Sequence, residues 1–224
     1  MGYMILAGLL TVVGMLVSWR LKSKFAHYSQ MPLRNGMSGA EVADTMLKYY
    51  GIYDVQIHPS EGMLSDHYNP MNKTVNLSPD VFNGRNVAAA AVAAHECGHA
   101  VQHATSYPML KLRSTLVPIV NVANMSLQYL LILAFVLANQ FPALMMVTIV
   151  AFAITTLFAF VTLPVEFDAS NRALVWLDSS GVAQGAEHAG AKDALWWAAM
   201  TYVSAALSSL AMLIYLILRM NSRN

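Results

Sequence analysis

The stretch AAAAVAAHECGHAVQH, residues 88–103, contains the pattern His-x₃-His with a glutamate after the first histidine: His95, Glu96 and His99. On a helix, residues four positions apart lie on one face, so the imidazoles of His95 and His99 can bind one metal ion. Glu96 lies about 100° further around the helix, close enough to act as general base on a water molecule at that metal. Zinc favours such ligands, and a catalytic zinc site needs a third ligand from the protein.

The composition indicates an integral membrane protein. Of the 224 residues, 57% are hydrophobic and only 11% are charged, which departs strongly from the usage of soluble domains. Charged residues are absent from the segments 1–19, 114–165 and 194–218. The middle segment is long enough for two membrane crossings, and each of the others for one. The net charge of +1 gives no reason to expect nucleic acid, so the expected surroundings are a lipid bilayer.

The uncharged segments predict how the chain is organised. The first of them has no basic start and no small-residue cleavage site, so we interpret it as a retained anchor. A short loop at 139–142 joins two crossings that return the chain to the side it left, which places the residues after Pro164 on the same side as His95. The predicted parts are transmembrane helices at 3–19, 115–138, 144–163 and 195–218, a region at 20–113 with a small sheet and the metal helix, and a segment at 164–193.

The region 20–113 is expected to contain both helices and strands. Ser38 and Glu41 form a capping box, which predicts a helix that ends near Gly51. Three short β-like runs with turn residues between them predict a small antiparallel sheet: 52–57, 63–68 and 73–77. We expect the last strand, 74–78, either to offer a free edge to an extended peptide or to be an ordinary edge strand. The metal helix, about 86–104, is too polar to be a membrane span.

Glu166 is the first charged residue after the uncharged segment 114–165. It follows two predicted crossings and arrives where a third metal ligand is required, so we interpret it as that ligand. The alternative is a carboxylate favoured near a helix N-terminus by the helix dipole. Asp168 is the rival ligand; it lies about 200° around a helix from Glu166, so only one of the two would face the metal.

Several other polar side chains are candidates for a supporting role. A tetrahedral intermediate would need a donor for its oxyanion, and the sequence does not rank the candidates. His103 follows His99 by four residues, whereas a metzincin ligand would follow by six, so we interpret it as a neighbour of the site or a surface residue. Cys97 is the single cysteine; it fits a reducing compartment and a packing role. The candidate donors are His67, Tyr68, His103, Arg172 and His188.

Four motifs together carry a resemblance to a known family. They are AspHisTyrAsnPro (66–70), LysThrValAsnLeuSer (73–78), HisGluCysGlyHis (95–99) and LeuProValGluPheAspAlaSer (163–170). From about residue 35 to 215 the chain resembles the bacterial YugP-type membrane zinc metallopeptidases, which are neutral zinc metallopeptidases with a gluzincin-like site. The resemblance implies that Zn²⁺ is held by His95, His99 and Glu166, and that Glu96 is the catalytic base.

The same resemblance leaves open which residue forms the hydrogen bond that orients a zinc-binding histidine. In related membrane gluzincins with an ExxxD pattern, an aspartate four residues after the ligand glutamate braces a zinc histidine. Ser170 occupies that position here, and its hydroxyl is a weaker, neutral partner. Ser170 and Asp168 are therefore both candidates for bracing the zinc ligands.

The sequence therefore predicts a mainly α-helical membrane protein with about four transmembrane helices and a small cytoplasmic α+β zincin-like catalytic region. Eleven of the 13 Lys and Arg residues lie in 20–113 and 166–193, which the positive-inside rule places in the cytoplasm; Arg219 and Arg223 favour the opposite. The resemblance implies an endopeptidase of the bacterial cell membrane that acts on a peptide or protein, membrane proteins included. No partner subunit is identified.

Three other classes of protein fit the sequence less well. An intramembrane metalloprotease would carry its HExxH inside a span, whereas charged residues flank the helix here. A zinc-stabilised adaptor without proteolytic activity would not need Glu96. A transporter is disfavoured because the predicted spans contain no charged residue that could mark an ion path.

Overall fold

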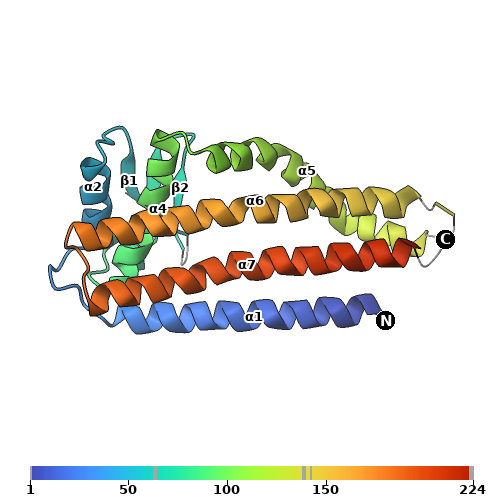
Figure 1. Cartoon of the computed structure of the whole chain (residues 1–224), viewed down its shortest axis with the longest axis horizontal. Coiled ribbons are helices and arrows are strands. Elements are labelled where there is room, and N and C mark those ends of the chain that lie inside the picture. The colour runs from blue at the N-terminus through green and yellow to red at the C-terminus, as the bar shows by residue number, and fades with distance from the viewer. Residues whose placement is uncertain (1, 63–64, 138–139, 142, 222–224) are drawn as a thin grey trace. The chain divides into compact units, whose positions relative to one another are not determined.

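The computed structural model describes residues 2–62, 65–137, 140–141 and 143–221 (Figure 1). The chain divides into two compact units, and α1, α5, α6 and α7 contribute residues to both. The apolar unit comprises residues 1–17, 111–164 and 201–224, and the site unit comprises residues 18–110 and 165–200. The elements are α1 (Gly2–Ser29), α2 (Gly39–Tyr49), β1 (Gln56–Pro59), β2 (His67–Asn69), β3 (Thr74–Leu77), α3 (Pro79–Phe82), α4 (Val87–Ala104), α5 (Pro108–Val136), α6 (Ala143–Ser179) and α7 (Ala186–Asn221).

Four of the described helices are long and apolar enough to cross a membrane: α1, α5, α6 and α7. This confirms the prediction of a mainly helical chain with about four such helices. α4 is not among them, which agrees with its expected place outside the spans. The predicted end of the second crossing at residue 138, and residues 139 and 142 of the predicted loop, lie outside the described residues.

The helices extend beyond the predicted membrane segments. α6 continues through Pro164 and Glu166 to Ser179, so it joins the predicted crossing at 144–163 to the predicted segment 164–193 in one helix. Neighbouring groups can compensate for a proline inside an apolar helix, and no glycine follows before Gly181 to end it. α7 begins at Ala186, so its first two turns lie within the predicted segment 164–193, where the sequence indicates a polar loop with one or two helical turns.

The small sheet differs from the prediction in its topology. β3 is the middle strand; β1 pairs with it in parallel and β2 in antiparallel orientation. The predicted all-antiparallel sheet with 74–78 on an edge is therefore wrong, and the edges are β1 and β2. Val75 and Leu77 are fully buried and Thr74 nearly so, which means that both faces of β3 are covered, as suits a central strand. Residues 63–64 of the predicted second run lie outside the described residues.

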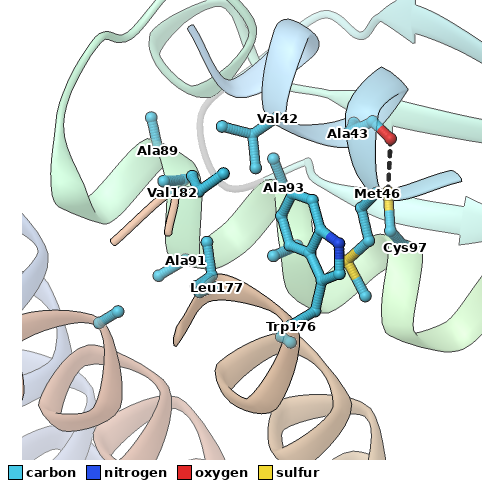
Figure 2. Packing of buried hydrophobic residues seen from close by; sticks show 14 of the residues in the cluster. Val42, Ala43, Met46, Ala89, Ala91, Ala93, Cys97, Trp176, Leu177 and Val182 are labelled. Carbon is cyan, nitrogen blue, oxygen red and sulfur yellow. Dashed lines mark hydrogen bonds between the residues drawn. The ribbon is translucent and has the colours of Figure 1, made fainter. Parts of the chain in front are cut away.

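The core of the site unit is built around α4. Its alanines pack against Val42 and Met46 of α2 and against Trp176 and Leu177 of α6 (Figure 2). Alanine side chains are small, so the neighbouring helices can approach the α4 backbone closely. α4 is consequently buried along almost its whole length, which holds the HExxH residues in a rigid setting.

Cys97 belongs to this core. It is fully buried, and its thiol donates a hydrogen bond to the backbone oxygen of Ala43 in α2, with an Sγ to oxygen distance of 3.6 Å (Figure 2). Burial, with smaller contributions from the charges of Glu96 and Asp44, raises the pKa of the Cys97 thiol well above its ordinary value. A buried neutral thiol is unreactive, so the packing role predicted for Cys97 agrees with its surroundings.

Candidate metal centre

Three side chains from two helices converge in the site unit. His95 and His99 lie one turn apart on α4, with ring centroids 4.8 Å apart and ring planes at 83°. Glu166 of α6 places its Oε2 atom 3.4 Å from His95 Nε2 and 3.6 Å from His99 Nε2. All three candidate ligand atoms lie within 4.8 Å of one another.

The residues present fit a zinc ion. Two imidazole nitrogens and one carboxylate oxygen form the ligand set of a catalytic zinc site, in which a fourth position is left for water. Glu166 and His99 are buried, with 3% and 9% of their surfaces exposed. A buried carboxylate needs a positive partner, and a cation held by the three side chains would be such a partner.

The carboxylates of Glu166 and Glu96 affect the pKa of His99. Burial alone would lower it, but the hydrogen bond and charge of Glu166, with the charge of Glu96, raise the pKa of His99 above its ordinary value. The cluster therefore tends to retain a proton when no cation is bound. Because imidazole must be deprotonated to act as a ligand, cation binding releases that proton.

Glu96 lies beside the cluster and is itself held in place. It is buried, and its Oε2 atom accepts a hydrogen bond from the backbone N–H of Tyr68 in β2 at 2.9 Å. A carboxylate has several acceptor positions, so this bond orients the group without using up its capacity to accept a proton. β2 thus positions the candidate base relative to the two histidines.

Each candidate histidine ligand has a neutral partner on its other ring nitrogen. His95 Nδ1 lies 3.0 Å from Ser170 Oγ, and His99 Nδ1 lies 3.0 Å from Gln102 Oε1. Such partners orient the ring so that the remaining nitrogen faces the metal. Ser170 therefore occupies the bracing position that the sequence left open, and it contacts His95.

Asp168 reaches the cluster only through another side chain. Its Oδ2 atom accepts hydrogen bonds from Gln102 Nε2 at 2.8 Å and from Arg172 Nε at 2.6 Å. Asp168 is thus tied to Arg172 one turn along α6, and it is not part of the group of three candidate ligands. Gln102 was not predicted from the sequence; its signal is a polar side chain three residues after His99, on the same face of the helix.

Tyr68 and His103 form a pair near the candidate base. The Tyr68 hydroxyl lies 2.7 Å from His103 Nδ1. Burial, together with the charge of Asp54, raises the pKa of Tyr68 to about 12, so its hydroxyl keeps its proton at neutral pH and can donate a hydrogen bond.

The other predicted donors have different surroundings. Arg172 is engaged with Asp168 and also lies over the ring of Tyr107, 5.9 Å from its centroid. His67 Nδ1 lies 2.7 Å from the backbone oxygen of Ser65. Among the residues that the structure describes, neither His67 nor His188 of α7 joins the group of candidate ligands.

Gly98, inside the HExxH pattern, allows the two ligand-bearing helices to meet. A β-carbon built at this position would lie 2.5 Å from the backbone oxygen of Ala169 in α6. No atom in this contact belongs to a flexible side chain, so any larger residue must push α4 and α6 apart. The close approach of His95 and His99 to Glu166 therefore depends on a glycine at position 98.

The substitution Gly98→Ala tests this dependence. We expect it to lower the free energy of unfolding by about 1–3 kcal/mol, because overpacking displaces backbone, and to reduce the amount of zinc bound. Thermal unfolding and metal analysis of the purified variant measure the two effects. Gly14→Ala is the matched control, because among the described residues nothing beyond its chain neighbours and its own helix backbone lies within 4 Å of a β-carbon at that position. Full zinc binding by Gly98→Ala would show that the helices can separate without loss of the site.

Comparisons with known proteins identify the family of the chain. A family model described as "putative neutral zinc metallopeptidase" matches residues 3–221. The chain is also 40% identical over 207 residues to the "Putative membrane protease YugP" of Bacillus subtilis (strain 168), covering 92% of this chain and 91% of that protein. No solved structure matches the chain. Since the family model spans almost the whole sequence, the chain belongs to the family of putative neutral zinc metallopeptidases.

Proposed function

We propose that this chain is a membrane-anchored, zinc-dependent endopeptidase that hydrolyses peptide bonds at the cytoplasmic face of a bacterial cell membrane. The observation that supports the proposal most is the convergence of His95, His99 and Glu166 beside the buried carboxylate of Glu96. Membership of a zinc metallopeptidase family and the similarity to a protein named as a membrane protease support the same activity.

In this proposal His95, His99 and Glu166 hold the ion, and Glu96 transfers protons. Zinc, when bound, supplies Lewis acidity that polarises the scissile carbonyl and makes water a stronger nucleophile. Glu96 accepts the proton of the attacking water and delivers it to the leaving amine. The bond from the Tyr68 N–H keeps one Glu96 oxygen in place during both transfers. The burial of Glu96 limits competing hydration of this carboxylate.

The oxyanion of the tetrahedral intermediate needs a hydrogen-bond donor that is positioned in advance. We favour Tyr68 as this donor for two reasons. Its backbone N–H contacts Glu96, which places Tyr68 beside the candidate base. Its hydroxyl, which is paired with His103, keeps its proton at neutral pH. Arg172 is less suited to the task because Asp168 engages it.

Cleavage by the purified protein tests the proposed activity. The detergent-solubilised chain is loaded with Zn²⁺ and incubated with an unfolded protein substrate, and products are identified by mass spectrometry. We expect internal cleavage that a chelator abolishes and added Zn²⁺ restores. Zinc bound in stoichiometric amounts without any cleavage would instead indicate an adaptor stabilised by the metal.

The orientation is a separate part of the proposal and has its own test. The excess of Lys and Arg in residues 20–113 and 166–193 favours a cytoplasmic site. A protease-sensitive tag inserted in the 139–142 loop should then be cleaved by protease added outside spheroplasts. Protection of that tag until the cells are lysed would place the site on the outer face.

A further inference from the structure

Gln102 lies at a junction between the two helices that carry the candidate ligands. It is three residues after His99 on α4, and its side chain is fully buried. Its amide oxygen faces His99 Nδ1 at 3.0 Å, whereas its amide nitrogen contacts two acceptors on α6: the backbone oxygen of Val165 at 2.7 Å and Asp168 Oδ2 at 2.8 Å. Both amide protons and one lone pair of the amide oxygen thus have partners, as expected of a buried polar side chain.

These contacts determine which way the amide is turned. Val165 O and the Asp168 carboxylate can only accept hydrogen bonds, so the NH₂ group of Gln102 must face them and its oxygen must face His99. The amide oxygen can also only accept, so His99 Nδ1 must be the donor. When His99 gives up a proton on binding a cation, the proton that remains is therefore on Nδ1, and Nε2, which lies 3.6 Å from Glu166 Oε2, offers its lone pair to the cation.

The network continues along α6 to a fixed charge. Asp168 accepts a hydrogen bond from Arg172 Nε at 2.6 Å in addition to the bond from Gln102. Arg172 balances the charge of Asp168, and Gln102 connects this ion pair to His99 through a neutral amide. Val165 immediately precedes Glu166, so one amide group links a ligand of α4 to the backbone beside the ligand of α6.

We propose that Gln102 is a positioning residue for zinc: its amide sets the tautomer of His99 and couples His99 to the segment of α6 that carries Glu166. The inference rests on the proposed function, because it assigns a role toward the zinc ion of that site. An uncharged partner orients the imidazole without the increase in ligand basicity that a carboxylate partner would give. Asp168 thereby acts on the orientation of His99 through Gln102, and not as a ligand.

Zinc affinity, measured by competition with a chelating dye, tests this role without relying on proteolysis. Gln102→Leu substitutes an apolar side chain of similar size and removes all three contacts. We therefore expect zinc affinity to fall by about 10–100-fold, with a changed absorption spectrum of the Co²⁺-substituted protein. Glu187→Gln is the matched control: Glu187 is also buried and accepts a hydrogen bond from the Arg34 N–H, yet it is not in the cluster. We expect its zinc affinity to stay within about twofold of wild type.

A second pair of variants, which exchanges the amide and the carboxylate between positions 102 and 168, tests the role if Gln102→Leu does not fold. Gln102→Glu retains an acceptor for His99, but its carboxylate replaces the amide donor and faces two acceptors, Val165 O and Asp168 Oδ2. This repulsion should outweigh the more basic partner of His99, so zinc affinity should fall. Adding Asp168→Asn supplies an amide donor to the new carboxylate and should restore part of the affinity. A double variant that binds zinc no more tightly than Gln102→Glu would overturn the coupling to α6.

The outcomes separate this inference from the proposed function. If the wild-type chain binds no zinc, the proposed function fails and no role for Gln102 remains. If the wild-type chain binds zinc and cleaves peptides, but folded Gln102→Leu has wild-type zinc affinity and an unchanged Co²⁺ spectrum, only the positioning role is overturned.

Discussion

Replacing Glu96 with glutamine should reduce peptide-bond hydrolysis by about 10²–10⁴-fold while zinc stays bound, because the variant loses the general base and keeps the three candidate ligands. The glutamine side chain has the same shape, and its amide oxygen can still accept the bond from the Tyr68 N–H. It cannot accept the proton of the attacking water. The measurements are kcat/KM on a cleaved peptide and zinc content by elemental analysis, both made on purified protein.

Glu187→Gln is the control for this substitution, since it makes the same chemical change at a buried glutamate outside the cluster. Its kcat/KM should equal that of the wild type. Proteolysis retained by Glu96→Gln would remove Glu96 from the mechanism and transfer the role of base to another group. A loss of zinc together with activity would instead show that Glu96 contributes to the metal site itself.

The same pair of proteins can identify the substrate. Cells carrying wild type and cells carrying Glu96→Gln should differ in the peptides and membrane proteins that accumulate, because the variant keeps its fold and its zinc but not its chemistry. Comparison of the two by mass spectrometry gives both the cleaved proteins and the residues at the cleavage point. An activity that occurs in vitro without any such difference in cells would argue against proteolysis as the physiological role.

The sequence predicted those parts of the candidate site that helical periodicity or the number of membrane crossings decides. The spacing of His95 and His99 on one helix face follows from helical periodicity alone. The uncharged segment 114–165 predicted that Glu166 would return to the side of His95, and the structure brings the two side chains to 3.4 Å. That these side chains bind zinc stays a prediction, which the zinc measurements above address.

Features that depend on contacts between distant segments could not be predicted in this way. The pairing of β1 with β3 joins strands that are not neighbours in sequence, and the apolar pattern of residues 73–77 is equally consistent with an edge or a central strand. Gln102 gains its role only because α4 and α6 approach closely enough for its amide to reach Val165 and Asp168. That approach depends in turn on Gly98 and on the small side chains of α4.

The other large expected effect is on zinc affinity, and it distinguishes Glu166 from Asp168 as the third ligand. Glu166→Ala should weaken zinc binding by more than about 100-fold, because the loss of a ligand should exceed the effect of losing a supporting residue. Asp168→Ala removes only the charged end of the network behind His99 and should weaken binding by about 10-fold. Chelator competition, carried out on both variants at one pH, measures the difference.

The geometry explains why the two carboxylates should behave so differently. Glu166 Oε2 lies 3.4 and 3.6 Å from the two imidazole Nε2 atoms, a span that a cation bound to all three atoms can bridge. Asp168 Oδ2 already accepts bonds from Gln102 and Arg172, and turning toward the metal would break both. If Asp168→Ala lost zinc and Glu166→Ala retained it, Asp168 would be the third ligand, and the network of Gln102 and Arg172 would have to rearrange when zinc binds.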